Sequence, residues 1–425
     1  MSEQYAMLVG LDWADQKHDL CWRDTATGKM HTAVLEHHPE RINEWITECL
    51  SKYPGGRIAI CLEQSRGPVA YALMGYEGVD LYPVNPATLS NYRSAFRPSG
   101  AKDDPSDAGF LLELLERHPE ALKVWQPGDE QTRLLHSLCE DRRKAVDLRT
   151  SLCNRLRARL KEYYPQALQL VGRELYSELC CAFLMKWPRF EALAASRAQT
   201  LRSFYYAQHS RSEKKIGQRL ELIAGSRPLC SDAAVVEAAI LWIKTLVPQL
   251  RALNRAIKSY DQRIGELFLA HPDRLIFQSF PGAGAQLAPR LLTAFGTDRN
   301  RYATAVDATT YLGVAPVVVR SGKQEWIHWR WHCPKFHRQS AVEFAAKSIG
   351  YSGWAKLYYD EQIKRGKGHH AAVRALAYKW IRIIFRCWQQ RVAYDETIYL
   401  AALQKHGSWI SNKLKEASEI NDCTT

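Results

Sequence analysis

The sequence lacks the features that mark secreted and membrane proteins. Its 425 residues contain no run of ~18 uncharged apolar residues, so we expect no membrane span. The N-terminal segment reaches an acidic side chain before any apolar run that is long enough for a signal peptide. Eleven cysteines occur without a C-x-x-C pair, which does not indicate a disulfide framework. We therefore expect a protein of the reducing cytoplasm.

Repeats and low-complexity segments are also lacking. No internal similarity with a period of ~20–50 residues is present, so a solenoid is not expected. The composition is ordinary for a globular protein, with 46% hydrophobic and 24% charged residues, which excludes a disordered or collagen-like chain. A chain of this length is expected to form two or three domains.

Charge is unevenly distributed along the chain. The net charge is +13, but residues 1–107 carry 10 basic and 15 acidic side chains, whereas the remainder carries 48 and 30. This asymmetry predicts a carboxylate-lined site in the front part and a surface that attracts polyanions such as nucleic acid in the rear part. A basic surface without a specific partner would account for the net charge equally well.

The first ~110 residues show the alternation typical of a layered α/β domain. Short apolar runs predict strands at 7–11, 19–23, 32–35, 57–62 and 79–84. Helical spacing predicts helices at 39–53 and 69–76, with a third beginning near Asp104. Three strands followed by alternating helices and strands is the order expected of a ribonuclease-H-like domain.

The middle of the chain is predicted to be helical. Residues 130–164 have helical periodicity, and apolar residues from 246 to 267 step by four and three, which is typical of a coiled-coil seam. An ordinary core helix shows the same spacing, so the partner of this seam stays open. The segment 166–230 is rich in aromatic and basic residues and is not assigned.

The rear part mixes helices with a short sheet. A strand is predicted from Tyr311 to Val319, a turn at 321–323, and helices at 286–294, 337–349 and 370–390. We predict an α/β plus α protein with three domains: a catalytic α/β domain at 1–125, a helical coiled-coil region at 126–272, and a mostly helical domain at 273–425.

Four carboxylates in the front part are candidates for a metal site. Asp12 and Glu63 each end a predicted strand, which is a common place for functional residues in open sheets. Asp104 and Asp107 share one face at the start of a helix. Oxygen-only ligands suit Mg²⁺ or Mn²⁺, and such ions can promote phosphodiester displacement. Asp104, Pro105 and Asp107 equally fit a helix N-cap with an acidic first turn.

The sequence resembles a known family at these residues. Its acidic segments are Gly10-Leu-Asp12-Trp, Cys61-Leu-Glu63-Gln-Ser and Lys102-Asp-Asp104-Pro-Ser-Asp107-Ala. They are similar to the three acidic blocks of the DEDD transposases of insertion sequences, which are described as bridge-RNA-guided recombinases. The rear segments Phe280-Pro-Gly-Ala-Gly284, Tyr311-Leu-Gly-Val-Ala-Pro316 and Ser321-Gly322 resemble the second region of that family.

The resemblance implies a RuvC-like ribonuclease-H fold in front and a helical transposase domain behind. It implies that Asp12, Glu63, Asp104 and Asp107 bind Mg²⁺, or Mn²⁺ in its place, and that Ser321 forms a phosphoserine link to DNA. It also implies donor and target DNA and a structured guide RNA as partners of a dimer or tetramer in the bacterial nucleoid. Asp103 stands beside Asp104, so either residue can be the third acid.

Further residues are predicted to bind nucleic acid. Gly282 and Gly284 precede a helix, an arrangement in which backbone N–H groups can face a phosphate, although a simple turn also explains them. Trp326 and Arg330 belong to a stretch of alternating aromatic and basic residues that suits unpaired bases, or that packs into a core. A basic helix segment completes the set: Arg155, Arg157, Arg159 and Lys161.

Two other functions compete with recombination. A nuclease for branched DNA would use the four acids for two-metal hydrolysis without a serine nucleophile. A non-catalytic nucleic-acid-binding protein would retain the fold alone, and the presence of all four acids argues against it. No residue near Ser321 in the sequence is a convincing base, although His328 or His332 could come close across a hairpin. We therefore expect the Mg²⁺ cluster to help activate the serine or to stabilise the charged phosphorane.

Overall fold

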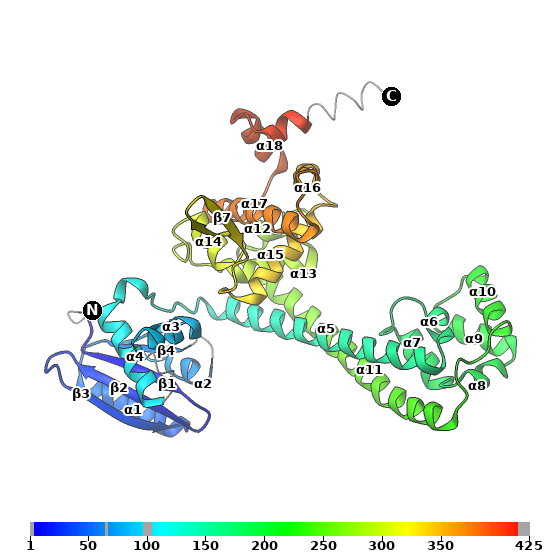
Figure 1. The fold of residues 1–425 in the computed structure, drawn as a ribbon, viewed down its shortest axis with the longest axis horizontal. Helices are drawn as coiled ribbons and strands as arrows, with labels where there is room; N and C mark the ends of the chain where they lie inside the picture. Colours follow the sequence, from blue (N-terminus) through cyan, green and yellow to red (C-terminus); the bar gives the residue numbers. More distant parts are fainter. Residues whose placement is uncertain (1–3, 64–66, 97–103, 415–425) are drawn as a thin grey trace. The chain divides into compact units, whose positions relative to one another are not determined.

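The computed structural model describes residues 4–63, 67–96 and 104–414, and for Asp104 and Pro105 it describes the backbone only. Figure 1 shows the helices and strands of the chain. The chain divides into two compact units, residues 1–127 and 128–425. The first unit is built on a sheet and the second is almost entirely helical, so the predicted combination of an α/β part with a helical remainder is confirmed.

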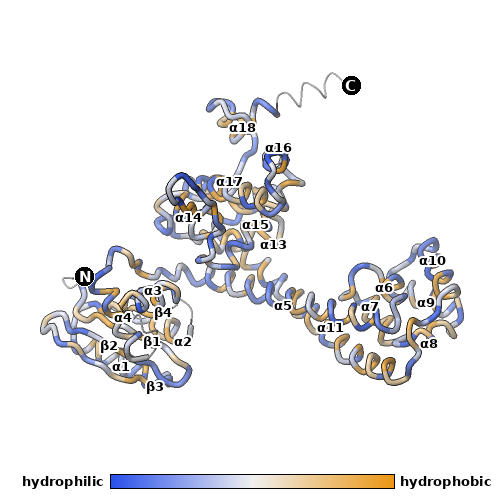
Figure 2. Tube along the Cα trace, viewed as in Figure 1, coloured by the Kyte–Doolittle hydropathy of each residue, from blue (hydrophilic) through white to orange (hydrophobic). Residues whose placement is uncertain are grey.

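A mixed five-stranded sheet forms the centre of the first unit. Its strands are β1 (Met7–Trp13), β2 (Lys17–Asp24), β3 (Met30–Glu36), β4 (Ile58–Glu63) and β5 (Val79–Val84). The order is β3-β2-β1-β4-β5. The hairpin strands β1, β2 and β3 pair antiparallel, whereas β4 runs parallel to β1 and β5 runs parallel to β4. All five predicted strands are confirmed. The central strands β1 and β4 are mostly buried, and Figure 2 colours the hydropathy of their residues along the trace.

Helices cover both faces of this sheet. One face packs on α1 (Pro39–Lys52) and α2 (Pro68–Leu73), and the other packs on α3 (Pro86–Phe96) and α4 (Asp104–Arg117). A short 3₁₀ turn, η1 (Pro119–Ala121), follows α4. The helices at α1, α2 and α4 were predicted, but α3 was not, although Asn85 and Pro86 form a typical helix start.

Gly10 allows α4 to pack directly on the middle of β1. A Cβ atom at this position would lie 2.0 Å from the Ala108 carbonyl oxygen and 2.5 Å from the Leu112 nitrogen. Any side chain would therefore have to push the helix backbone away from the strand. The glycine thus fixes the depth at which α4 sits on the sheet.

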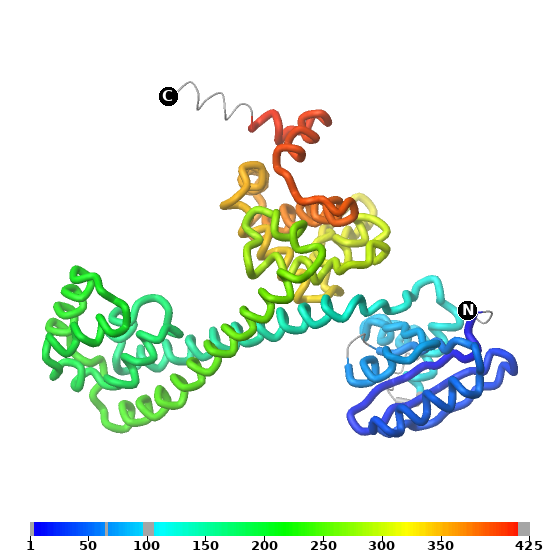
Figure 3. Tube along the Cα trace, turned by 180° about the vertical axis from the view of Figure 1, so that it is seen from behind, coloured from blue at the N-terminus to red at the C-terminus, as the bar shows by residue number. Residues whose placement is uncertain are grey.

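Two long antiparallel helices pack against each other in the second unit. They are α5 (Glu130–Tyr163) and α11 (Ala233–Ala270), which lie side by side in Figures 1 and 3. Arg142 pairs with Asp261 at 2.5 Å, and Arg149 donates to Asn254 at 3.1 Å, which gives the antiparallel register. The heptad seam of α11, including the buried Ile257, therefore packs against a helix of the same chain.

Among the described helices, α11 alone is long and apolar enough to cross a membrane, with a mean hydropathy of 1.5 in its most apolar stretch. Core helices meet the same criterion, so it is weak evidence. Ile243 and Val247 lie in a hydrophobic core with the neighbouring helices, and Glu237 and Lys244 interrupt the apolar stretch. These contacts identify α11 as a core helix.

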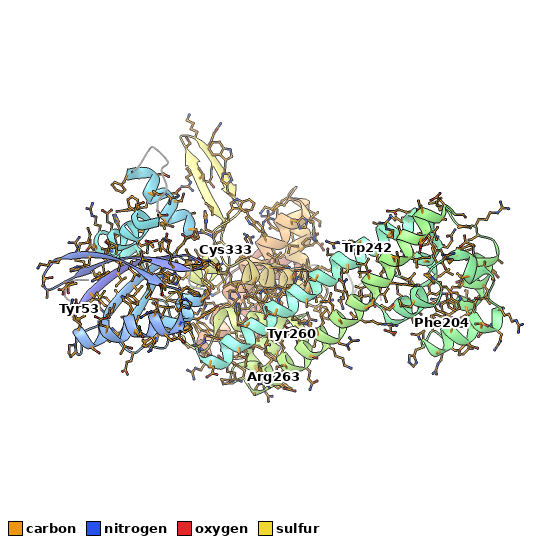
Figure 4. All side chains as sticks on the ribbon, turned by 90° about the horizontal axis from the view of Figure 1, so that it is seen from below. Tyr53, Phe204, Trp242, Tyr260, Arg263 and Cys333 are labelled. Carbon is orange, nitrogen blue, oxygen red and sulfur yellow. The ribbon has the colours of Figure 1, made fainter. Side chains whose placement is uncertain are left out.

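A compact helical module occupies the segment that the sequence left unassigned. Its helices are α6 (Gln166–Leu170), α7 (Glu178–Lys186), α8 (Phe190–Ala194), α9 (Ala198–Ala207) and α10 (Glu213–Ala224). Their aromatic residues, among them Phe183, Trp187 and Phe204, pack with the end of α5 and the start of α11. Figure 4 labels Phe204 within this module.

The rear of the second unit surrounds a separate hydrophobic core. Its elements are α12 (Arg274–Gln278), α13 (Gly284–Phe295), α14 (Ala305–Tyr311), β6 (Val317–Ser321), β7 (Gln324–His328), α15 (Lys335–Ser348), α16 (Gly353–Lys364), α17 (His369–Gln390) and α18 (Glu396–Lys405). The helices predicted at 286–294, 337–349 and 370–390 are confirmed. The strand predicted from Tyr311 was wrong in its first half, because α14 continues to Tyr311 and the residues after it form a turn in which Gly313 has φ +68°.

Of the two predicted domain boundaries, one agrees with the division into compact units and the other does not. The predicted boundary after residue 125 lies two residues before the end of the first unit at residue 127. The one after residue 272 falls inside the second unit, because Ile264 and Phe268 of α11 belong to the same core as α13 and α17. Three domains with these boundaries remain a prediction.

We predict that Gly10→Ala destabilises the first unit by about 1–3 kcal/mol, because its methyl group overlaps the backbone of α4. Gly109→Ala, within α4 itself, is the matched control: no atom lies within 4 Å of its added Cβ, so it should be neutral or stabilising. Urea unfolding of the full chain measures both. Equal midpoints for the two variants would show that α4 does not rest on Gly10.

Candidate active site

The carboxyl ends of β1 and β4 bring two predicted acids together. The strands pair in parallel register, with Leu11 opposite Leu62, so the next pair along the sheet is Asp12 and Glu63. Adjacent strands lie about 4.8 Å apart. Both side chains are partly exposed, in contrast to the buried residues that precede them.

Both acids lie on the face of the sheet that α4 covers. Gly10 faces α4, and successive side chains of a strand alternate between faces, so Asp12 points to the same side. On β4, Cys61 packs in the core shared with α4, which places Glu63 on that side too. The pair therefore shares one face and one edge of the sheet.

A third acid, Asp19 of β2, belongs to the same row and was missed by sequence reasoning. It lies directly opposite Asp12 in the antiparallel register, and it is only 8% exposed. Directly opposed residues share a face, and like charges in that position destabilise a sheet unless a cation offsets them. The signal for Asp19 was the register of the β1–β2 hairpin, which the short connection at residues 14–16 sets and the spacing of acids does not reveal.

The start of α4 lies at this same edge. Near the end of the helix, Glu116 pairs with Arg23, which is opposite Leu8 at the beginning of β1. Because α4 therefore runs opposite to β1, its first turn lies beside the carboxyl end of the strand. That turn carries Asp107, which is 2% exposed.

Asp107 is held by a basic residue that the sequence did not indicate. Nη1 of Arg93 in α3 donates to both carboxylate oxygens, at 2.8 and 2.6 Å. The guanidinium is itself largely buried. The role of Arg93 arises from the packing of α3 on α4, which local spacing does not indicate beyond the helix start at Pro86.

The chemistry of the donor set fits a divalent cation. The acids supply only carboxylate oxygens, which Mg²⁺ and Mn²⁺ prefer. Within the part of the chain that the structure describes, no three acids, imidazoles or thiols form a group that would hold a metal ion as it stands. The side chain of Asp104 and all of Asp103 lie outside that part, so the choice between them stays open.

Neighbouring titratable groups do not compete for this role. Burial raises the pKa of the Cys61 thiol, so a thiolate is not available beside Glu63. Burial, together with the nearby His37, lowers the pKa of His18 to about 4. His18 is therefore neutral at neutral pH, and it adds no positive charge at this end of β1.

Ser321 lies at the tip of an exposed hairpin in the second unit. It ends β6 and pairs with Gln324 across the two-residue turn of Gly322 and Lys323, where Gly322 has φ +57°. Every residue of both strands except the partly buried Val317 is exposed, and Figure 4 shows their side chains on both sides of the ribbon. Arg320 beside the serine is paired with Glu325 at 2.7 Å.

His328 does not come close to Ser321 across the hairpin. The register puts His328 opposite Val317, four residues from the serine along the strand, which corresponds to ~13 Å. His332 follows after the end of β7, farther along the chain from the turn.

Of the three tryptophans that follow the hairpin turn, two are exposed and the third, Trp329, is half-buried. Trp326 is 44% exposed and Trp331 is 73% exposed, so the alternative of core packing is wrong for both. Trp329 is half-buried, and the guanidiniums of Arg338 and Arg374 lie over its ring. Arg330 is also half-buried, and its Nε atom has no hydrogen-bond partner.

Gly282 and Gly284, at the start of α13, are surrounded differently. At Gly282, with φ +80°, a Cβ atom would lie 3.3 Å from the backbone of Lys347 and 3.1 Å from Tyr351. Close packing on α15 therefore explains this glycine. Gly284, with φ +54°, begins α13 and has open space around it, so a phosphate could approach only there.

The four basic residues near the end of α5 do not form one patch. At 100° per residue, Arg155 and Arg159 lie on one side of the buried stripe, and Arg157 and Lys161 lie on the other. Arg159 pairs with Glu162, and Arg157 donates to Asn154. Arg155 and Lys161 are exposed.

Comparison with known proteins gives the family. Residues 9–165 match a family model described as a transposase, and residues 274–360 match one described as transposase, IS116/IS110/IS902 family. The first match contains the acids of the sheet edge, and the second contains Ser321. The acids and the hairpin therefore lie within the two segments that the family models match.

Individual relatives agree with these matches. The mini-circle putative transposase for IS117 of Streptomyces coelicolor is 25% identical over 94% of this chain and 98% of its own length. A putative transposase, y4uE, of Sinorhizobium fredii is 30% identical over 40% of this chain and 48% of its own length. An uncharacterized 43.6 kDa protein of insertion element IS110 of S. coelicolor is 23% identical over 70% of this chain and 73% of its own length. The chain belongs to the IS116/IS110/IS902 family of insertion-element transposases.

Proposed function

We propose that this transposase cleaves and exchanges DNA strands in a reaction that requires a divalent cation, Mg²⁺ or alternatively Mn²⁺. The observation that supports this best is the row of Asp19, Asp12 and Glu63 across three adjacent strands, on the face that the start of α4 covers. Such a row of like charges is stabilised by a bound cation. The mixed sheet order supports assigning the first unit a RuvC-like ribonuclease-H fold.

In this proposal Asp12, Glu63, Asp104 and Asp107 hold the cation. A divalent ion held there would draw charge from phosphodiester oxygens and ease displacement at phosphorus. Arg93 keeps the Asp107 carboxylate in place by donating to both of its oxygens. Asp19 adds negative charge beside Asp12 and thereby strengthens attraction for a cation.

Ser321 is the proposed nucleophile. Its hydroxyl oxygen attacks phosphorus, a new P–O bond forms, one strand oxygen leaves with the electron pair of the broken P–O bond, and the serine proton passes to solvent. The phosphoserine link then conserves the energy of the phosphodiester for rejoining. The exposed hairpin tip supports this role, because DNA can reach the hydroxyl without displacing other side chains.

A structured guide RNA is the proposed selector of donor and target DNA, with two or four copies of the chain acting together in the bacterial nucleoid. The basic rear of the chain supports polyanion binding, since residues 108–425 carry 48 basic and 30 acidic side chains. Arg155 and Lys161 are the proposed phosphate contacts of α5, because both are exposed and neither is ion-paired in the described residues.

Asp12→Asn should lower the rate of strand cleavage by at least ~100-fold in Mg²⁺, because an amide keeps the shape and removes the charge. Asp15→Asn is the matched control, since it removes an exposed carboxylate three residues away. Single-turnover cleavage of element-end DNA measures both variants. A rate near that of the unchanged protein in Asp12→Asn would contradict the metal assignment.

Ser321→Ala should lose the covalent protein–DNA adduct and all recombination while retaining DNA binding. Denaturing gel electrophoresis of trapped reactions detects the adduct, and Ser408→Ala at a distant helix start controls for loss of a serine. An adduct that persists in Ser321→Ala places the nucleophile elsewhere. Cleavage without any adduct in the unchanged protein would instead indicate two-metal hydrolysis of branched DNA.

Replacing both Arg155 and Lys161 with Gln should reduce the slope of log affinity against log salt by about 1.4–1.8, because about two fewer counterions are released. Arg159→Gln should change it less, since Glu162 already neutralises that guanidinium. Filter binding of the guide RNA measures this slope, and salt concentrations from roughly 50 to 200 mM span a range wide enough to resolve it. An unchanged slope in the double variant would identify a solvated face.

A further inference from the structure

A cavity of about 380 Å³ lies in the second unit beside the base of the β6–β7 hairpin. The segment 313–316 and the small side chains Ala371 and Ala375 of α17 line part of it. Tyr358 and Tyr378 supply aromatic rings at the same wall. The volume falls in the range of ~300–1,000 Å³ that holds small ligands.

The charge of this cavity is entirely positive. Its lining includes Lys367, Arg330 and Arg374 but no carboxylate. The guanidinium of Arg374 is held over the ring of Trp329, 4.5 Å from its centroid, rather than by an acid. A cation–π contact fixes a guanidinium without neutralising it, so the charge remains available to an anion.

Two further donors in the cavity lack charged partners. Nε of Arg330 is buried without a hydrogen-bond partner, which favours an incoming acceptor. The Lys367 ammonium donates only to the neutral amide oxygen of Gln362, at 2.7 Å. An anionic ligand that reaches the cavity therefore meets three cations that no described acid neutralises.

We propose that this cavity binds one unpaired nucleotide, with the base against Tyr358, Tyr378 and the alanines of α17 and the phosphate against Arg374, Arg330 and Lys367. Aromatic faces with adjacent cations and an apolar floor are the combination that recognises an unstacked base. A fully paired duplex cannot place a base there, so the nucleotide must be single-stranded or turned out of the helix.

The position of the cavity connects it to the proposed chemistry, and the inference in this respect rests on the proposed function. His328 of β7 lines the cavity and lies opposite Val317 of β6. Ser321 ends β6, four residues and therefore ~13 Å from Val317. At 3.4 Å per nucleotide along a strand, this spans about four nucleotides. A nucleotide held in the cavity would fix which phosphate of its strand meets the serine.

The test uses the full chain and oligonucleotides that carry a fluorescent adenine analogue. Three DNA probes share one sequence: a single strand, a duplex with one unpaired analogue, and a fully paired duplex. The same three probes made of RNA show whether the bound nucleotide comes from DNA or from RNA. The unchanged protein should bind the unpaired-base probes more tightly than the paired ones, with a change in analogue emission on binding.

Arg374→Gln should weaken binding of the unpaired-base probes about tenfold and leave paired-duplex binding unchanged. Lys364→Gln is the matched control, because it removes an exposed charge from the end of the adjacent α16. Ala375→Phe, which fills the cavity and keeps every charge, should abolish the change in emission. Since it can also strain the packing of α17, its unfolding midpoint is measured alongside.

The results separate this inference from the proposed function. Equal losses on paired and unpaired probes, or equal losses in Arg374→Gln and Lys364→Gln, would overturn the nucleotide pocket. A protein that recombines DNA without any preference for unpaired bases would also overturn it, and the proposed function would stand. A protein that prefers unpaired bases but never cleaves would support the pocket while contradicting the proposed function.

Discussion

The candidate active site depends on the direct contact between β1 and α4 at Gly10. Because no side chain separates the strand from the helix, the helix backbone sits within contact distance of the middle of the sheet. The ion pair of Arg23 and Glu116 then fixes the direction of α4, so that its first turn lies at the carboxyl ends of β1 and β4. The acids of helix and sheet share one edge for this reason.

A guanidinium compensates the burial of the Asp107 carboxylate at this edge. A carboxylate that is 2% exposed would be costly to bury alone, by several kcal/mol. Arg93 offsets that cost by donating to both oxygens. A divalent ion that uses Asp107 must share the carboxylate with Arg93 or replace it, which makes α3 part of the metal equilibrium. Asp12 and Asp19, opposed across the hairpin, favour the ion in the same equilibrium.

The five strands and the helices α1, α2 and α4 of the first unit could be predicted from sequence, because short buried strands and amphipathic helices follow simple periods. The acids Asp12 and Glu63 could be predicted for the same reason, since both end such strands. Asp19 and Arg93 could not, because their roles arise from hairpin register and from the packing of α3 on α4. These are contacts between segments, which local spacing does not encode.

In the second unit, the positions of several helices could be predicted from sequence, but the elements that pack against them could not. The heptads of α11 predicted a helix with an apolar seam but not its partner, and the pairing of Arg142 with Asp261 shows that α5 is the neighbour. The strand expected from Tyr311 begins only at Val317, because α14 continues to Tyr311 and a turn with Gly313 at φ +68° follows it. The alternation around Trp326 gave the hairpin, but the exposure of its side chains depends on what packs against the strands.

The central claim is that the sheet edge and the start of α4 form one cation site. Direct binding of Mn²⁺ to the full chain, followed by electron paramagnetic resonance as free ion disappears, tests it without DNA or catalysis. The account predicts saturable binding that Asp12→Asn weakens at least ~10-fold, while Asp15→Asn leaves it unchanged. Equal binding by both variants, or none by the unchanged protein at millimolar Mn²⁺, would contradict it.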